Sequence, residues 1–378
     1  MTKIEWTEET WNPVVGCSKV SEGCKNCYAI TMANRLAHIH ATTELYMDTV
    51  TKTAGGLLNW TGVVNVSEGA MDKPLWTRKP TMFFVNSMSD LFHESVPFEV
   101  IHRVFAVMAL CPQHTFQILT KRADRMAEYF KKYENGIGDK IENRVYQYLE
   151  YMHGPDGRLL PALREAGWMW DETYANNDGS IDKDTELLFE HEGPLPNVWM
   201  GVSVENQKCA DERIPFLLQV PAAIRFLSCE PLLGKISLAI EAPEWDDAGA
   251  SRIYSLEGRR TDMGRPCSDT NKIDWVIAGG ESGAGSRPMH PDWVRSLRDQ
   301  CIYSKVPFFF KQWGDWGPHP PKPVEGKYTG AGIFIKPDGR YGDQGEWWDG
   351  TATAMDRKGK GKTGKKLDGI IHQEFPKK

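Results

Sequence analysis

The sequence lacks a second group of closely spaced cysteines, although it contains eight cysteines in 378 residues. Cys17, Cys24 and Cys27 lie in one short stretch, and the other five stand far apart from one another. A structural zinc site is normally closed by four ligands, so neighbouring cysteines alone cannot complete one here. The irregular spacing also argues against a disulfide framework, and we therefore expect a reduced, cytoplasmic environment.

Long apolar runs are absent as well. The longest uncharged apolar run covers residues 104–112, whereas a membrane-spanning helix needs roughly 20 such residues. The first residues, MTKIEWTEE, contain no apolar core of the kind found in signal peptides. We therefore expect no membrane partner.

An excess of positive charge and a complete serine-hydrolase motif are also missing. The net charge of −6 argues against strong non-specific affinity for nucleic acid over the whole surface. Residues 280–284 lack the final glycine of G-x-S-x-G, so a serine hydrolase is not expected. A local basic groove is still compatible with the charge, because residues 357–366 hold six cations. We expect this segment to be a solvated loop or to contact phosphates, and to lie outside the strand-end cavity of the core.

The sequence does contain a repeated pattern of short apolar runs, each followed by polar residues and often by a helical segment. The runs cover residues 82–85, 116–119, 198–202, 224–227, 273–277 and 306–310. Such alternation is typical of parallel βα units whose sheet is covered on both faces. We therefore predict an α/β fold with a full or partial (β/α) barrel, and a doubly wound open sheet is the alternative. In both folds ligands bind at the carboxyl ends of the strands.

Shifts in composition divide the chain into a core and three other parts. The barrel core is predicted at residues 1–133 and 197–315, and residues 134–196 form an acidic insertion. Residues 240–272 form a second, loop-like insertion within the core, and residues 316–378 form a C-terminal appendage rich in Gly, Trp and Lys.

The three neighbouring cysteines predict a metal centre. Pro13, Gly16 and Gly23 supply sharp turns, and a short loop gathers soft ligands at little cost in loop-closure entropy. Three thiolates on a 4Fe–4S cluster leave one iron without a protein ligand, where a small molecule can be held. The alternative is a zinc knuckle completed by a more distant group such as His38 or His40.

The residues around these cysteines read WNPVVGC at positions 11–17 and GCKNCYA at positions 23–29. They resemble a phage-associated three-cysteine-motif family of radical-SAM-like proteins, and the similarity covers most of the chain. The spacing is C-x6-C-x2-C instead of the widespread C-x3-C-x2-C, and Asn26 stands where an aromatic residue is usual. The resemblance implies that S-adenosylmethionine (SAM) binds the free iron through its amino and carboxylate groups. One-electron reduction would then give a 5′-deoxyadenosyl radical.

Polar residues at the predicted strand ends are the candidates for binding SAM, which carries a carboxylate, an ammonium, a sulfonium and a ribose. Carboxylates and hydroxyls suit the ammonium and the ribose, whereas a cation, either Lys121 or Arg122, suits the carboxylate. The predicted SAM-binding residues are Ser87, Ser89, Asp90, Lys121, Ser203, Glu205, Asn206 and Glu230.

A second set of strand-end residues is assigned to the substrate. Radical SAM proteins often bind the SAM amino group with a Gly-Gly-Glu segment after the second strand, but residues 279–281 follow a late strand. The predicted substrate-binding residues are Gly280, Glu281, Ser282, Arg287, Lys311 and Gln312. No individual catalytic residue is predicted.

Two classes of function agree with these patterns. The first is a radical-SAM-type enzyme that needs an electron donor such as flavodoxin or ferredoxin. Its substrate would be a nucleic acid or nucleotide-related, because the chain combines the phage resemblance, a basic segment and 14 tryptophans that either pack on loops or stack on bases. The second is a non-catalytic, zinc-stabilised nucleic-acid-binding protein of phage origin.

Overall fold

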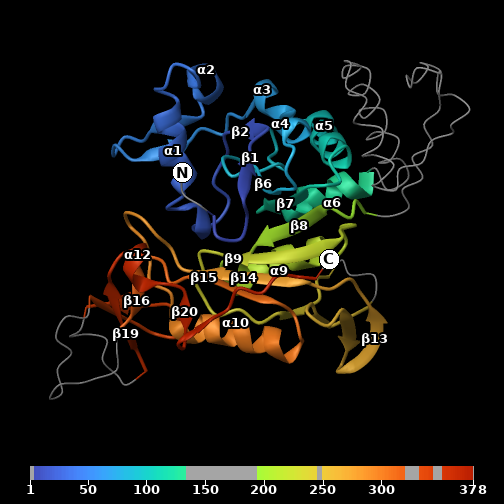
Figure 1. Ribbon diagram of the computed structural model, residues 1–378. Coiled ribbons are helices and arrows are strands. Elements are labelled where there is room, and N and C mark those ends of the chain that lie inside the picture. The colour runs from blue at the N-terminus through green and yellow to red at the C-terminus, as the bar shows by residue number, and fades with distance from the viewer. Residues whose placement is uncertain (1–3, 133–193, 245–248, 320–331, 344–350, 378) are drawn as a thin grey trace, which may run out of the picture. The chain divides into compact units, whose positions relative to one another are not determined.

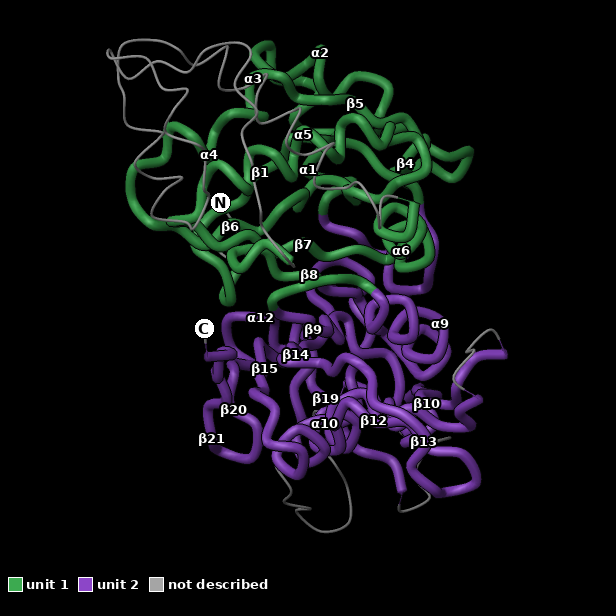
Figure 2. The backbone as a smooth tube through the Cα atoms, turned by 90° about the vertical axis from the view of Figure 1, so that its right-hand side faces the viewer, with its two compact units in different colours: residues 1–18, 29–200, 220–223 green, residues 19–28, 201–219, 224–378 purple. Residues whose placement is uncertain are grey.

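The computed structural model describes residues 4–132, 194–244, 249–319, 332–343 and 351–377. The chain divides into two compact units (Figure 2). Unit 1 consists of residues 1–18, 29–200 and 220–223, and unit 2 consists of residues 19–28, 201–219 and 224–378. Cys17 therefore belongs to unit 1, whereas Cys24 and Cys27 belong to unit 2. Of the predicted acidic insertion, residues 134–193 lie outside the described residues.

The largest sheet has seven strands in the order β1-β6-β7-β8-β9-β14-β15. Their bounds are β1 (Glu9–Trp11), β6 (Met82–Val85), β7 (Thr115–Thr120), β8 (Val198–Ser203), β9 (Ile224–Cys229), β14 (Trp275–Gly279) and β15 (Phe308–Gln312). The pairs β1–β6, β6–β7, β9–β14 and β14–β15 run parallel. The predicted strands are all present, and β1 is an additional short strand that the apolar pattern did not reveal.

The strand order decides between the two predicted architectures. Each strand of the largest sheet lies beside its predecessor in the sequence, whereas a doubly wound sheet reverses its strand order at a switch point. The chain is therefore a mixed α/β protein whose sheet is compatible with a partial (β/α) barrel. The doubly wound alternative was wrong.

In unit 1, helices follow the strands as predicted. Helix α5 (Phe98–Ala109) follows β6, and α6 (Ala123–Lys132) follows β7. Phe116 of β7 stacks on Phe83 of β6 with ring centroids 5.7 Å apart, so apolar rings fill the sheet face. Residues 41–79 contain several short elements. The remaining elements are β2 (Val14–Val15), α1 (Tyr28–Leu36), α2 (Thr43–Tyr46), β3 (Val50–Lys52), β4 (Leu58–Trp60), β5 (Asn65–Val66), α3 (Glu68–Met71) and α4 (Lys73–Trp76).

In unit 2, helix α9 (Gln207–Leu217) follows β8, and α10 (Pro291–Tyr303) follows β14. Asn206 caps α9 because its Oδ1 accepts a hydrogen bond from the backbone N–H of Cys209 at 3.0 Å. Helix α10 lies along β14 and β15 and contacts both strands (Figure 1). A short 3-10 helix, η1 (Glu22–Cys24), lies within the cysteine stretch.

Residues 240–272, predicted to be loop-like, instead contain most of a four-stranded antiparallel sheet. Its strands are β10 (Ala239–Glu241), β11 (Arg252–Tyr254), β12 (Arg259–Asp262) and β13 (Arg265–Asp269). The first three strands bury one residue each, namely Ile240, Ile253 and Thr261. A strand with a single buried residue gives no apolar run and little alternation, which is why the pattern suggested a loop.

The C-terminal residues form a further antiparallel sheet in the order β16-β19-β17-β18 and a short hairpin, β20–β21. The elements are β16 (Trp316–Pro318), β17 (Ile333–Ile335), β18 (Tyr341–Gly342), β19 (Thr353–Arg357), α12 (Lys360–Thr363), β20 (Lys366–Leu367) and β21 (Ile370–Ile371). Close to the end of the chain, the carbonyl of His372 accepts a hydrogen bond from the backbone N–H of Phe310 at 2.8 Å. The edge of β15 is thereby partly covered, which protects it from pairing with another chain.

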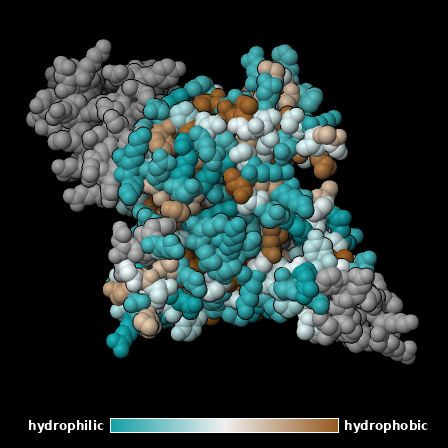
Figure 3. All heavy atoms as spheres, turned by 180° about the vertical axis from the view of Figure 1, so that it is seen from behind, coloured by the Kyte–Doolittle hydropathy of each residue, from teal (hydrophilic) through white to brown (hydrophobic). Residues whose placement is uncertain are grey.

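On the face shown in Figure 3, apolar side chains form small, separate patches among hydrophilic ones. Within the described ranges, no helix combines the length and apolar character that crossing a membrane requires.

Candidate functional site

Asp90, which follows β6, is the centre of a buried network in unit 1. Its Oδ1 accepts hydrogen bonds from Thr120 Oγ1 at 2.6 Å and from the backbone N–H of Phe92 at 3.0 Å. Its Oδ2 accepts from the backbone N–H of Lys121 at 3.0 Å and from Arg122 Nη1 at 3.1 Å. The side chains of Asp90 and Arg122 are 7% and 4% exposed. Asp90, predicted to bind SAM, thus has four protein donors around its carboxylate.

Arg122 connects this network to Cys17. Its Nε donates to Glu94 Oε1 at 2.9 Å, its Nη2 donates to Ser18 Oγ at 2.7 Å, and its Nη1 lies 3.9 Å from Cys17 Sγ. Burial alone would lower the pKa of Arg122, but the carboxylates of Asp90 and Glu94 outweigh it and raise that pKa. A permanent positive charge beside Cys17 favours the thiolate, which is the form that binds metals.

His93 holds the same part of the chain. Its Nδ1 accepts a hydrogen bond from the backbone N–H of Ser95 at 3.1 Å, so the neutral ring carries its proton on Nε2. That nitrogen lies 2.9 Å from Ser18 Oγ and donates to it. Burial lowers the pKa of His93, and the nearby Arg122 lowers it further, so the ring stays neutral at pH 7. Ser18 is therefore held by two side chains.

In unit 2, Glu205 holds the residues next to Cys24. Glu205 is completely buried, and its Oε2 accepts from Arg213 Nη1 at 2.9 Å. Its Oε1 accepts from Ser21 Oγ at 3.0 Å, and Ser21 Oγ in turn lies 3.9 Å from Cys24 Sγ. A Cβ on Gly23 would lie only 2.3 Å from Glu205 Oε1, so this close approach requires glycine. Glu205, predicted to bind the ribose of SAM, is thus hydrogen-bonded to the cysteine stretch.

Glu281, which follows β14, anchors the segment between Cys24 and Cys27. Arg287 donates to both of its oxygens, from Nη2 to Oε1 at 2.7 Å and from Nε to Oε2 at 2.9 Å. Asn26 Nδ2 donates to Glu281 Oε2 at 3.1 Å and to the carbonyl of Gly285 at 2.8 Å. Asn26, at the position where an aromatic residue was expected, thus ties the loop to a strand end.

Glu230 and Lys311 form a charged pair at the ends of β9 and β15. Lys311 Nζ lies 2.8 Å and 2.9 Å from the two carboxylate oxygens, and Gln312 Nε2 lies 3.5 Å from Oε1. The side chains of Glu230 and Lys311 are 19% and 13% exposed, so the pair is less enclosed than Asp90–Arg122. Gln312 Oε1 is buried and has no hydrogen-bond partner among the described residues. These three predicted residues are therefore brought together, and Glu230 and Lys311 retain some access to solvent.

Two predicted serines of unit 1 hold the chain that leads to Cys17. Ser87 Oγ donates to Asn12 Oδ1 at 3.1 Å, and Ser89 Oγ donates to the carbonyl of Val14 at 2.7 Å. Both contacts join the end of β6 to the residues just before the first cysteine. These contacts neither support nor contradict the predicted role of the two serines in binding SAM.

The other predicted residues lie in unit 2 or on the Asp90 network. The backbone N–H of Lys121 donates to Asp90. Ser203 is buried, and its carbonyl accepts a hydrogen bond from Arg213 Nη1 at 2.7 Å. Asn206 caps α9, whereas Ser282 Oγ is buried and without a hydrogen-bond partner among the described residues.

Gly280 lies where the loops after β14 and β15 meet. A Cβ on Gly280 would lie 1.9 Å from the carbonyl oxygen of Trp313, a backbone atom that cannot rotate away. Gly280→Ala is therefore expected to lower the free energy of unfolding by about 1–3 kcal/mol, the usual cost of overpacking. Gly361→Ala is the matched control, because a Cβ there meets no heavy atom within 4 Å. Equal melting temperatures of the two variants in thermal denaturation would contradict this close approach.

The cysteines fall into three groups by burial: three are partly exposed, four are buried, and Cys267 is exposed. None forms a disulfide; Cys17, Cys24 and Cys27 are partly exposed. Burial raises the pKa of the Cys111, Cys229 and Cys301 thiols, and together with Glu205 it raises the pKa of Cys209 to about 11. Thiols of this second group remain protonated at pH 7 and are poor ligands. The chemistry of the donors therefore fits a cluster on the three motif cysteines.

The side-chain geometry does not by itself reveal a metal centre. Among the residues that the structure describes, no three His, Cys, Asp or Glu side chains form a group that could hold a metal ion. Of the histidines suggested for a zinc knuckle, His38 has its Nδ1 2.7 Å from the carbonyl of Asn34, and His40 is exposed.

Sequence reasoning missed several side chains that hold the cysteine stretch. Ser18, Ser21 and Asn26 lie between the cysteines, and their polar character was the available signal. His93 and Arg213 gave no such signal, because buried and exposed examples of these residue types look alike in a sequence.

Comparison with known proteins gave one result. The family model described as "Protein of unknown function (DUF5131)" matches residues 1–376. Neither the curated proteins nor the solved structures contain a match. The chain belongs to the DUF5131 family.

Proposed function

We propose that the chain is a radical-SAM-type enzyme that holds a 4Fe–4S cluster on Cys17, Cys24 and Cys27. The observation that carries the proposal is a set of three ion pairs whose carboxylates are buried. In the pairs Asp90–Arg122, Glu205–Arg213 and Glu281–Arg287 the carboxylates follow three different strands, and each pair is hydrogen-bonded to the stretch that bears the cysteines. Burying a charge costs free energy. Three ion pairs that all bond to one loop therefore indicate that the geometry of this loop has a function.

The donors are suited to an iron–sulfur cluster. Each pair reaches the stretch through a residue close to a cysteine, namely Ser18, Ser21 and Asn26. Arg122 also places positive charge 3.9 Å from Cys17 Sγ, which offsets the negative charge of thiolate ligands. When bound, such a cluster supplies one electron and an open iron for SAM.

Other residues of the chain would bind and orient the cofactor and the substrate. Glu230 offers a carboxylate for an ammonium group, and Lys311 offers an ammonium group for a carboxylate. Both groups are already paired, so a zwitterionic ligand would exchange one ion pair for two without leaving a charge uncompensated. Gln312 Oε1 would supply a further acceptor. The enzyme would receive its electron from a donor such as flavodoxin or ferredoxin in the cytoplasm.

The test is anaerobic purification followed by iron, sulfide and zinc analysis. We expect about four irons and four sulfides per chain, and release of 5′-deoxyadenosine after addition of SAM and dithionite. Zinc without sulfide would overturn the proposal and favour the zinc-stabilised nucleic-acid-binding protein. Iron and sulfide without SAM cleavage would restrict the cluster to a structural or electron-transfer role.

A further inference from the structure

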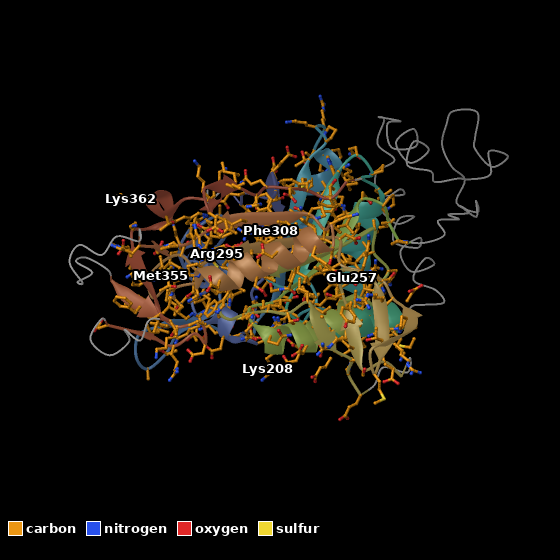
Figure 4. All side chains as sticks on the ribbon, turned by 90° about the horizontal axis from the view of Figure 1, so that it is seen from below. Lys208, Glu257, Arg295, Phe308, Met355 and Lys362 are labelled. Atoms are coloured by element: carbon orange, nitrogen blue, oxygen red, sulfur yellow. The ribbon has the colours of Figure 1, made fainter. Side chains whose placement is uncertain are left out.

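Residues 357–366, here called the basic segment, form a strongly charged surface of unit 2. The segment contains six cations and no acid. All of these cations except Lys360 are exposed. Lys362 and Lys366 have no ion pair among the described residues, and Figure 4 labels Lys362. Arg357 pairs with Asp315 at 3.7 Å and Lys358 with Asp356 at 3.0 Å, so only these two of the six cations are seen to lie beside a carboxylate among the described residues.

The basic segment is attached to the loops at the strand ends. Arg357 Nη2 donates to the carbonyl of Gly283 at 3.0 Å, in the loop after β14. Thr363 Oγ1 donates to the carbonyl of Gly314 at 2.6 Å, in the loop after β15, and the backbone N–H of Lys360 donates to Asp315 Oδ1 at 3.1 Å. The segment was expected to lie outside the strand-end cavity, and these contacts attach it to the loops after two strands of the sheet. Ligands of parallel sheets bind on this side.

A short path of hydrogen bonds leads from the basic segment to the cysteine stretch. The backbone N–H of Asp315 donates to the carbonyl of Glu281 at 2.9 Å. The carboxylate of the same glutamate holds Asn26, which lies between Cys24 and Cys27. Two residues of unit 2, Asp315 and Glu281, thus link the basic segment to the cysteine stretch.

The backbone of the basic segment is open to a ligand. Residues 359–365 read GKGKTGK, and a Cβ on any of these three glycines would meet no heavy atom within 4 Å. Gly359 and Gly364 have positive φ, but Gly361 has neither a positive φ nor a close neighbour. The folded chain therefore does not require glycine at position 361, whereas a ligand that approaches the backbone closely would favour it.

An aromatic ring lies next to these cations. The guanidinium of Arg357 lies 5.9 Å from the ring centroid of Trp316, whose Nε1 donates to the carbonyl of Ser286 at 2.8 Å. Trp316 is partly exposed. Cations beside an aromatic ring are typical of surfaces that bind the phosphates and bases of single-stranded nucleic acid.

We infer that the basic segment binds the phosphodiester backbone of a single-stranded nucleic acid that is the substrate. This inference rests on the proposed function, because it places the polymer beside the strand-end loops that hold Cys24 and Cys27. The net charge of −6 does not oppose it, since charges farther away than a Debye length of about 8 Å are largely screened at physiological salt. An acidic electron-transfer protein would also be attracted by lysines, but it would not require an open glycine backbone.

The experiment measures binding of the cluster-loaded protein to fluorescein-labelled single-stranded DNA and RNA 20-mers by fluorescence anisotropy at several salt concentrations. The test variant is K362S/K365S/K366S. The matched control is K52S/K79S/K208S, which removes the same charge from exposed lysines elsewhere, and Lys208 lies apart from Lys362 in Figure 4. We expect the test variant to bind at least about tenfold more weakly and its log–log salt slope to flatten by about 2, or roughly 0.7 per lost contact. The control should match the wild type.

Several results would overturn the inference. These are wild-type protein that binds neither polymer, an unchanged affinity and salt slope in the test variant, or an equal loss in both variants. Weakened binding of reduced flavodoxin without any binding of nucleic acid would assign the lysines to the electron donor instead. Iron and sulfide analysis of the same preparations separates the two proposals. Lysine-dependent binding by a cluster-free, zinc-containing chain would support the nucleic-acid surface while the enzyme proposal failed.

Discussion

Replacing Cys17, Cys24 or Cys27 with alanine, one at a time, is expected to abolish the iron–sulfur absorption near ~400 nm of anaerobically purified protein. Each thiolate is an obligatory ligand of a cluster that has only three, so the loss of one leaves two irons without protein ligands. The expected effect is therefore complete loss of colour and of acid-labile sulfide. The measurement is the absorption spectrum together with the iron and sulfide content per chain.

The remaining cysteines provide controls. Cys267 is exposed, and Cys267→Ala should keep the full cluster content. Cys111, Cys209 and Cys301 are buried, and alanine at these positions should cost stability but no iron. Loss of iron in one of these variants would reveal a fourth protein ligand, which would close the site and exclude SAM. Full colour in any motif variant would remove that cysteine from the ligand set.

Most of the sheet could be predicted from the sequence because all of its strands except β1 are buried along nearly their whole length. All six residues of β8 are buried, and so are five of the six residues of β7, which produces a visible apolar run. The strand β1 has only three residues and one buried side chain, so it produces no run. Strand order is likewise not contained in a local pattern, because it depends on pairing between segments far apart in the sequence.

The candidate site could be predicted only where its residues are adjacent in the sequence. The spacing of the cysteines indicated a metal centre, but Glu205 bonds to Ser21, which lies 184 residues away. A carboxylate at a strand end can serve a ligand or a neighbouring loop, and the sequence does not distinguish the two. Glu205 and Glu281 proved to hold the loop, whereas Glu230 kept partial access to solvent.

Arg122→Met is expected to lower the free energy of unfolding by about 3–5 kcal/mol. The substitution removes the partner of Asp90, whose side chain is 7% exposed, and leaves an uncompensated charge in the interior. It also removes the hydrogen bond to Ser18 Oγ and the positive charge beside Cys17. We therefore expect the variant to lose iron to a chelator faster than the wild type does.

The control is Arg103→Met, because Arg103 pairs with Glu68 at the surface, where the two side chains are 28% and 67% exposed. An exposed pair contributes about 0–1 kcal/mol, so this variant should unfold close to the wild type. Urea denaturation of the cluster-free proteins separates stability from cluster binding, and iron release to a chelator is then measured on the loaded proteins. Equal stability of the two variants would mean that the negative charge of Asp90 is compensated by groups other than Arg122. If Arg122→Met loses stability but releases iron at the wild-type rate, Arg122 stabilises the fold and does not support Cys17 as a ligand.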